Sequence, residues 1–390
     1  MSRTPIIAGA ADVPLKGGRV LDGANVLKIQ ALAAQEALEM AGLTFADVDG
    51  LMVTGMWAIP GPGQLMTVTM AEYLGIQPTY HDCTNIGGST FESFIARAKV
   101  AIEAGECDTC LILYGSTQKS EMSRNLAGRA PVFNMQYETP SGMPTPVGGY
   151  AMAAKRHQFE YGSTREDLAN IAVSARRWAQ LNEHATKRDP LSIDDVLSAP
   201  LISDPLSNRD CCLVTDGGGA IVVTLKEKAK DLKMKPIYIR GFGECASHWH
   251  IAQMPDMANL DVARIAGEKA FKQAGLTPKD MDIVQVYDSF TITVLLTIEA
   301  LGFCKPGEGG AFLRHERTGP GGEFPMNTSG GGLSYAHPGM FGMFLLTEAC
   351  KQIWGLCGDR QVANVTNALC HGTGGTLSSG ATCILSTEER

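Results

Sequence analysis

The sequence predicts an α/β fold made of two related halves. Residues 28–53 and 261–287 share one pattern, namely an amphipathic helix, the letters AGLT, an acidic turn and a β-rich run. A looser pair, residues 91–114 and 340–366, gives a helix, a glycine and then a strand in each copy. Repetition of a helix–strand pattern in the same order is the signature of a duplicated unit. We therefore expect an α/β protein in which the second half repeats the first.

The individual elements follow from spacing and residue type. Residues 91–104 have apolar positions too dense for a surface helix, so we expect a mostly buried one. Residues 162–188 begin with a Ser-Thr pair followed by acids, as in a capping box, and continue at helical spacing. The runs at 220–225 and 382–386 are apolar and β-branched, typical of strands covered on both faces. A further strand is expected around residues 361–366.

The domain organisation follows from the repeat. We expect the two halves at residues 1–235 and 236–390, with most of the active-site loops in the second half. The segment at about 115–215 is longer than a βαβ unit requires and contains the Pro/Gly-rich run PSGMPTPVGG. It is expected to form a largely helical insertion over the sheet of the first half.

Composition favours a large packed protein. The chain has 390 residues, of which 44% are hydrophobic and 19% are charged. This is enough apolar material for a large core and too little charge for a disordered chain. The 44 glycines have no three-residue period, which excludes collagen. Because the formal net charge is −8 and no basic run is present, nucleic acid is not an expected partner.

The sequence also bears on the cellular compartment. The first residues, MSRTPIIAGAADVPLKGG, lack the charged-then-apolar pattern of a signal peptide. No apolar stretch approaches the roughly 18 residues of a membrane span. The eleven cysteines are an odd number scattered through a long chain, which is typical of reduced thiols. We expect a cytoplasmic protein that does not associate with a membrane.

Three stretches of the second half combine glycines with reactive side chains, namely residues 287–290, 329–339 and 367–375. Glycines let backbone N–H groups approach a ligand closely, and a helix that begins beside such a loop offers donors to an oxyanion. Ligands of α/β proteins bind at the carboxyl ends of strands. Because each stretch is expected to follow a strand, the three together predict an active site in this half.

Each candidate residue also has a simpler explanation. Tyr287 is consistent with a packed residue after a strand, His337 with a turn residue and Cys370 with a small buried hydrophobe. The Cys-x-x-Cys pair at 107–110 has no second pair of ligands, so we expect no metal there. The His-Trp-His run at 248–250 alternates, so both histidines are expected on one side of a strand as pocket lining.

Four segments, at residues 161–188, 211–220, 330–338 and 370–372, resemble motifs of the thiolase superfamily. The first looks like a helical insertion, the second like an acid-Gly-Ala strand entry, and the last two like the Gly-His-Pro and Cys-x-Gly loops. The resemblance covers nearly the whole chain and is closest to the sterol-carrier-protein thiolase branch. It implies the thiolase fold, with duplicated βαβαβαββ halves in a five-layered αβαβα arrangement, and a homodimer.

The sequence departs from that family at the nucleophile. Thiolases have a nucleophilic Cys at the start of a helix, followed at fixed distances by an Ile and a Gly, for which Ile102 and Gly105 are the equivalents. Counting back places Gly88 at the nucleophile position, and Cys83 lies five residues too early. Because glycine cannot form an acyl-enzyme, covalent acyl transfer at this position is unavailable.

Two tyrosines indicate a subgroup. Tyr287 stands where thiolases have Asn or His, and Tyr335 stands where the sterol-carrier branch often has Lys. Both replacements resemble the lipid-transfer-protein aldolases, which are thiolase-like enzymes that shorten steroid side chains. The resemblance implies an acyl-CoA substrate and a small OB-fold/zinc-ribbon protein partner. Coenzyme A would enter and leave as part of substrate and product, and no permanently bound cofactor or metal is expected.

The expected reaction is retro-aldol cleavage of a β-hydroxyacyl-CoA to a ketone or aldehyde plus acetyl- or propanoyl-CoA. It needs a base for the β-hydroxyl proton and donors for the thioester enolate. By analogy with thiolase positions, Tyr335 or Tyr287 is the base, His337 binds the thioester oxygen, and Cys370 or His371 protonates the enolate. Replacement of Tyr335 by Phe should nearly abolish cleavage and leave folding intact. The backbone groups expected to hold the oxyanion are those of Gly88, Gly372, Gly374 and Gly375.

Two other functions stay open. In a thiolase-like acyltransferase, another thiol such as that of Cys370 would carry the acyl group, and a burst of CoA release or a mass increase on this residue would favour that function. In a non-catalytic acyl-CoA-binding subunit, CoA would bind without turnover even when a partner is present. The sequence does not identify the acyl group.

Overall fold

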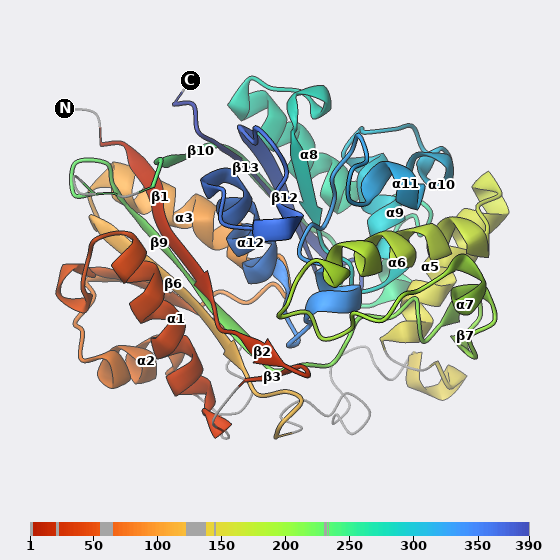
Figure 1. Ribbon diagram of the computed structural model, residues 1–390, viewed down its shortest axis with the longest axis horizontal. Coiled ribbons are helices and arrows are strands. Elements are labelled where there is room, and N and C mark those ends of the chain that lie inside the picture. Colours follow the sequence, from red (N-terminus) through yellow and green to blue (C-terminus); the bar gives the residue numbers. More distant parts are fainter. Residues whose placement is uncertain are drawn as a thin grey trace.

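A nine-stranded mixed sheet forms the centre of the protein, with the strand order β11-β12-β13-β10-β1-β9-β6-β4-β5 (Figure 1). The computed structural model describes residues 3–20, 23–54, 65–121, 138–143, 146–229, 232 and 234–389. The strands of this sheet are β1 (Pro5–Asp12), β4 (Gly50–Val53), β5 (Tyr80–Asp82), β6 (Thr109–Ser116), β9 (Gly217–Leu225), β10 (Ile237–Ala246), β11 (Ile283–Val286), β12 (Asn367–Gly374) and β13 (Ser379–Ser386).

The sheet repeats one strand order in its two halves. In the first half β1, β9, β6 and β4 are successive neighbours, and in the second half β10, β13, β12 and β11 are. The pairs β4–β6 and β11–β12 are parallel, and the other pairs in each series are antiparallel. A short antiparallel pairing of β1 with β10 joins the halves. The duplication expected from the sequence is thus confirmed, whereas the division at residue 235 stays a prediction.

Helices form three layers around the sheet. Helices α3 (Thr90–Ala104) and α12 (Gly342–Trp354) contact each other and strands of both halves, so they form the middle layer. Helix α1 (Val26–Met40) covers β1, β6 and β9 on one outer side, and α8 (Asp261–Ala274) covers β10 and β13 on the other. Figure 1 shows α1 and α8 on opposite sides of the strands. One half of the sheet lies between α1 and the middle layer, and the other half lies between the middle layer and α8. The expected five-layered αβαβα arrangement is thus confirmed.

The middle layer is held by apolar packing. Phe91, Phe94 and Ile95 of α3 are fully buried in a core cluster that includes side chains of α12 and of both halves of the sheet. The helix ends as expected at Gly105, whose φ of 83° is the left-handed conformation that glycine tolerates. Val100 is an exception to the buried helix that we expected, since it is 51% exposed.

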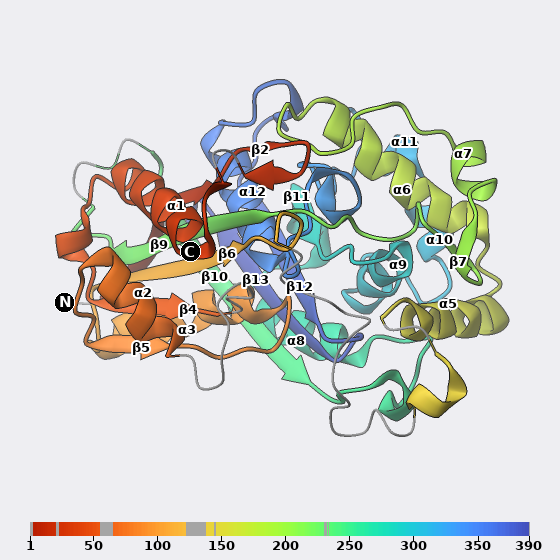
Figure 2. The ribbon, with the colours of Figure 1, turned by 90° about the horizontal axis from the view of Figure 1, so that it is seen from below.

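The insertion is helical in its described residues. Helix α6 starts at a capping box in which Thr164 and Asp167 exchange hydrogen bonds, as expected, but it ends at Gln180 rather than near residue 188. Figure 2 shows the inserted helices beside α9, and α6 also packs on the turn at 331–335. Residues 122–137 and 144–145 of the expected insertion lie outside the described residues. The elements here are α5 (Val147–Tyr161), α6 (Arg165–Gln180), α7 (Ile193–Leu197), β7 (Leu201–Ser203), β8 (Leu206–Ser207) and α9 (Thr291–Ala300).

Smaller elements complete the chain. No helix among the described ranges is long and apolar enough to cross a membrane. The remaining strands and helices are β2 (Leu15–Lys16), β3 (Arg19–Val20), α2 (Met66–Leu74), α10 (Gly309–Phe312) and α11 (His315–Thr318). Short helical turns lie at η2 (Phe45–Asp47), η3 (Thr139–Ser141), η4 (Ile251–Gln253), η5 (Pro278–Asp280), η6 (Gly331–Tyr335) and η7 (Gly358–Arg360).

Three local expectations were wrong. Residues 361–366 are not a strand, because Asn364 adopts a left-handed φ of 56° and β12 begins only at Asn367. Most of the third glycine-rich stretch is therefore strand β12 and not a loop. The histidines at 248–250 are not on a strand either, since β10 ends at Ala246.

Candidate active site

Gly88 lies directly before the first residues of α3, and the ring of Tyr287 fills the space beside it. A Cβ atom built on Gly88 would lie 2.1 Å from Cε2 and 2.5 Å from Cζ of Tyr287. It would also lie 2.6 Å from the carbonyl oxygen of Thr373. No side chain fits at position 88 while Tyr287 holds this position. The aromatic ring from the end of β11 thus occupies the place that a side chain of residue 88 would take.

Tyr287 and His337 form a hydrogen-bonded pair. The Tyr287 hydroxyl lies 3.0 Å from Nε2 of His337, and it accepts a hydrogen bond of 3.1 Å from the backbone N–H of Phe341. The two rings meet edge to face, with centroids 5.6 Å apart, and both residues are buried. Because the backbone N–H occupies an acceptor site of the hydroxyl, its proton is directed toward the imidazole or toward a ligand.

Tyr335 is bound to a carboxylate from the other half of the chain. Its hydroxyl donates a hydrogen bond to Asp12 at the end of β1, and the same carboxylate pairs with Lys351 of α12. Burial alone would raise the pKa of Asp12, but the Lys351 charge and the hydrogen bonds outweigh it and lower that pKa. Burial and the Asp12 charge raise the pKa of Tyr335 well above its usual value. Tyr335 is therefore a neutral phenol that points its proton at an ionised acceptor.

A row of four rings links the two tyrosines. Tyr287 packs on Phe341, Phe341 stacks on Phe344, and Phe344 packs on Tyr335, with centroid separations of 6.1, 5.5 and 6.3 Å. Both phenylalanines come from the start of α12 and are buried. The two phenol rings thus belong to one aromatic row, at one end of which the Tyr335 hydroxyl meets the Asp12–Lys351 ion pair.

Asp288 fixes the turn that carries Tyr335. Its carboxylate accepts hydrogen bonds from the backbone N–H groups of Gly332 at 2.7 Å and Leu333 at 3.2 Å. A Cβ atom on Gly331, whose φ is 62°, would lie 2.1 Å from the Asp288 carboxylate. Burial raises the pKa of Asp288 to about 7. Gly331 and Gly332 therefore serve close packing around this buried acid, whereas Gly330 packs against Ala179 of α6.

Replacement of Asp288 by Ala should destabilise the protein. Two buried N–H groups would lose their acceptor, at a cost of about 1–3 kcal/mol in the free energy of unfolding. Urea unfolding followed by circular dichroism measures this change. Asp280→Ala is the matched control, because that carboxylate caps an exposed turn. Equal effects of the two substitutions would contradict the anchoring role of Asp288.

Cys370 and His371 of β12 face opposite sides of the sheet. Cys370 packs in the core cluster of the middle layer, and its thiol lies 3.6 Å from the carbonyl oxygen of Leu345. Burial raises the pKa of this thiol well above its usual value. His371 points toward α8, bonds Thr382 at 2.8 Å, and has a pKa lowered by burial to about 3. The backbone N–H of Tyr287 donates a hydrogen bond of 3.0 Å to the His371 carbonyl oxygen, but the two side chains lie on opposite faces of the sheet.

The glycine-rich segments meet through their backbones. A Cβ atom on Gly374 would lie 1.8 Å from the carbonyl oxygen of Ile86, and one on Gly87 would lie 2.7 Å from the backbone nitrogen of Gly375. A Cβ atom on Gly372 would lie 2.7 Å from the Cα atom of Ser89. The start of α3 and the end of β12 thus approach more closely than side chains would allow. The site residues Gly88, Gly372, Gly374 and Gly375 are brought together.

A carboxyl group that the sequence patterns did not single out lies beneath these glycines. Glu92, in the first turn of α3, is buried, and burial raises its pKa to about 8. A Cβ atom on Gly372 would lie 2.2 Å from its Oε2 atom, and one on Gly342 would lie 2.6 Å from the same atom. An acid in the first turn of a helix is ordinarily a favourable interaction with the helix dipole, so its position offered no reason to select it.

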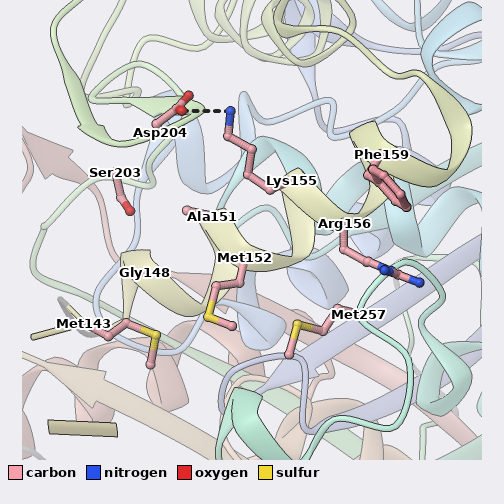
Figure 3. Close-up of a pocket in the computed structure, with 10 residues that line it drawn as sticks. All are labelled: Met143, Gly148, Ala151, Met152, Lys155, Arg156, Phe159, Ser203, Asp204 and Met257. Atoms are coloured by element: carbon pink, nitrogen blue, oxygen red, sulfur yellow. Dashed lines mark ion pairs between the residues drawn. The ribbon is translucent and has the colours of Figure 1, made fainter. Parts of the chain in front are cut away.

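A separate pocket of about 550 Å³ opens on helix α5, away from the tyrosines (Figure 3). Figure 3 shows the side chains of Met143, Met152 and Met257 on one side of the helix, while Lys155 points to Asp204, to which it is paired at 2.7 Å. None of the residues expected to take part in the chemistry lines this pocket. No group of three or more potential metal ligands occurs in the part of the chain that the structure describes.

The fold and the site together define a doubled α/β protein with a tyrosine–histidine pair where the two central helices begin. Residues 243–387 match the family model described as thiolase C-terminal domain-like. The chain is 30% identical to the 17-hydroxy-3-oxo-4-pregnene-20-carboxyl-CoA lyase of Mycobacterium tuberculosis, over 95% of this chain and 96% of that protein. It is 29% identical to the steroid side-chain-cleaving aldolase of Thermomonospora curvata, over 97% of this chain and 98% of that protein.

A solved structure agrees with these relatives. The Ltp2-ChsH2(DUF35) aldolase is 29% identical and superposes with a TM-score of 0.87, covering 99% of this chain and 98% of that one. The chain belongs to the thiolase superfamily. Its named relatives of nearly the same length include lyase and aldolase enzymes, in agreement with the resemblance seen in the sequence.

Proposed function

We propose that the protein is an acyl-CoA lyase that cleaves the Cα–Cβ bond of a β-hydroxyacyl-CoA by a retro-aldol reaction. The observation that carries this proposal is the replacement of the thiolase nucleophile by Gly88, with the Tyr287 ring packed on it. No acyl group can be attached there, and the phenol of Tyr287 lies beside this position, next to which we place the reacting carbons. The lyase and aldolase relatives support the same reaction class.

The first step is removal of the β-hydroxyl proton. Tyr335 accepts this proton while its own proton passes to Asp12, so the tyrosine never has to ionise. This suits a phenol whose pKa is raised and whose hydroxyl already donates to a carboxylate. The electron pair of the O–H bond then forms the carbonyl group of the released ketone or aldehyde, and the Cα–Cβ electrons move into the thioester enolate.

The second step holds and protonates the enolate. His337 and Tyr287 donate hydrogen bonds to the thioester oxygen, and the positive end of α3 beside Gly88 stabilises the developing charge. The Tyr287 proton passes to Cα and completes acetyl- or propanoyl-CoA. His337 restores this proton with one taken from solvent, and Asp12 releases the β-hydroxyl proton to solvent, so the protons balance over one turnover. Of the two groups expected for this step, His371 lies on the other face of the sheet, and Cys370 is a buried thiol with a raised pKa. We therefore assign the proton to Tyr287.

The substrate and the assembly follow the relatives. The names of two relatives refer to a pregnene carboxyl-CoA and to steroid side chains, so a steroid side-chain thioester is the proposed substrate. The similar aldolase was solved with a DUF35 partner, which supports a small partner protein here. We further propose a homodimer in the cytoplasm, with coenzyme A as part of substrate and product and no permanently bound cofactor.

Product analysis tests the lyase function. The protein, copurified with any partner from its native host, is incubated with a set of β-hydroxyacyl-CoA thioesters that includes steroid side-chain thioesters. We expect a short acyl-CoA and a ketone in equal amounts, without a mass increase on the protein. Binding of CoA without turnover in the presence of the partner, or a trapped acyl adduct on a cysteine, would contradict the proposal.

A further inference from the structure

The Glu92 carboxyl group is enclosed by backbone from three elements. It lies against Gly342 at the start of α12 and Gly372 of β12, where built Cβ atoms would come within 2.6 and 2.2 Å of Oε2. The Cβ atom built on Gly342 would also lie 2.2 Å from the carbonyl oxygen of Gly88. Glu92 thus lies beneath the backbone at Gly88, the residue on which the Tyr287 ring packs, and we call this position the floor of the site.

Nothing in the described residues neutralises a charge at this position. Neither carboxyl oxygen of Glu92 has a hydrogen-bond partner among them. Burial raises the pKa of this group to about 8 and outweighs the lowering effect of its own backbone N–H, because a carboxylate without a side-chain partner in an apolar layer is costly. At neutral pH the group is therefore mostly an uncharged carboxylic acid.

The ionisable neighbours of Glu92 are thiols. Cys370 of β12 and Cys383 of β13 lie near enough for its charge to raise their pKa values, and Cys383 donates a hydrogen bond to the Glu92 carbonyl oxygen. Both thiols are neutral at ordinary pH because burial raises their pKa values further. Helix α12 presents Gly342 to the carboxyl group, which has no charge.

The remaining elements packed on α3 add no cation at this position. Glu244 of β10 is bound to Ser93 and Arg97 of the helix. Arg240 of the same strand is directed elsewhere, since its guanidinium donates to the carbonyl oxygens of Ala274 and Glu388. Tyr114 of β6 packs on Phe91, and β9 has no ionisable residue. Asp12, the ionisable residue of β1, is paired with Lys351. A negative charge on Glu92 would therefore act on the site without compensation.

The chemistry proposed above requires this floor to be uncharged. The enolate would form beside Gly88, where the positive end of α3 stabilises it. A carboxylate in the first turn of the same helix would oppose that field and repel the enolate. A neutral acid leaves the field intact.

We propose that Glu92 keeps the floor of the active site uncharged while the enolate forms, and that loss of its proton sets the alkaline limit of the lyase. This inference rests on the proposed function. Glu92 is a positioning residue, because it acts through the electric field at Gly88 and not by contact with the substrate.

The pH dependence of catalysis tests the proposal. We expect kcat/KM of the wild type to fall about tenfold per pH unit above pH 8, since the protonated fraction of Glu92 falls by that factor. Glu92→Gln and Glu92→Met carry no ionisable group, so their profiles should lack this break. Glu244→Gln is the matched control, because Glu244 of β10 also contacts α3 but is paired with Arg97, and this variant should keep the break. A break near pH 8 that persists in both Glu92 variants would overturn the proposal.

Deuterium exchange separates this test from the test of the lyase function. Exchange of the α-protons of acetyl- or propanoyl-CoA in D2O needs only the enolate, so it reports on Glu92 even when the cleaved substrate is not identified. We expect the same alkaline break in exchange, absent from Glu92→Gln. Exchange with this behaviour, without cleavage of any thioester, would contradict the lyase function but support the role of Glu92. Absence of exchange in the wild type would overturn the proposed role of Glu92.

Infrared spectroscopy provides a readout that does not depend on activity. The carbonyl stretch of a protonated carboxylic acid should be present in the wild type at pH 7, disappear with a midpoint near the pKa of about 8, and be absent from Glu92→Gln. Asp288→Asn distinguishes the second buried acid. No Glu92-dependent band at pH 7 would overturn the proposal even in an active lyase.

Discussion

Replacement of Tyr335 by Phe is expected to lower kcat/KM for cleavage by about 10³-fold, which lies within the range for loss of a general base. The change removes the oxygen that receives the substrate proton and the proton that passes to Asp12. Steady-state assays of ketone release measure the effect. Folding should be nearly unchanged, because the ring still packs on Phe344.

The control for this substitution is an exposed tyrosine, Tyr73, whose replacement by Phe should leave the rate unchanged. Deuterium exchange into acetyl- or propanoyl-CoA separates the two tyrosines further. Tyr335→Phe should retain exchange, since enolate formation from the product does not involve the β-hydroxyl group. Tyr287→Phe should lose both exchange and cleavage. Full cleavage activity of Tyr335→Phe would remove Tyr335 from the base role.

Addition of a single methyl group at Gly88 should be nearly as damaging. In Gly88→Ala the new Cβ atom meets the Tyr287 ring at 2.1 Å, so the ring must move away from His337 and from the Phe341 N–H group. We expect cleavage and exchange to fall by about 10²-fold, since a misplacement near 1 Å has effects of this size. Circular dichroism and thermal unfolding establish that the variant is folded.

A double-mutant cycle tests this interpretation. Tyr287→Ala removes the ring but leaves the Thr373 carbonyl oxygen, which lies 2.6 Å from the built Cβ atom. Gly88→Ala should therefore cause a smaller loss in the Tyr287→Ala background than in the wild type, and the two substitutions should be non-additive. Additive losses would show that the methyl group acts on something other than the ring, and the proposed packing of Tyr287 on Gly88 would then be wrong.

Repeats and local spacing were sufficient to predict most of the fold. The duplicated helix–strand pattern is present as the two matching strand orders, and the helix at 91–104 and the capping box at Thr164 are where they were expected. The prediction of a strand around 361–366 was wrong, because β-branched residues alone do not reveal the left-handed turn at Asn364. Tertiary pairing with β11 and β13 starts β12 only at residue 367.

The candidate site was only partly accessible from the sequence. Tyr287, His337 and Gly88 belong to recognisable motifs, and the structure brings them together. The partner of Tyr335 is Asp12, 323 residues away, and no local pattern links a residue at the end of β1 to a turn in the second half. Glu92 escaped notice because its environment is created by two glycines from distant segments.

The seam between β1 and β10 has a consequence for the gene. This seam is the pairing that joins the two halves of the chain. The first half supplies Asp12, Gly88 and Glu92, and the second half supplies Tyr287, Tyr335 and His337. A polypeptide shortened to either copy of the repeat would contain only part of the reacting groups and only part of the core cluster that both copies share. A gene split between the copies would therefore restore activity only if both fragments reassembled along this seam.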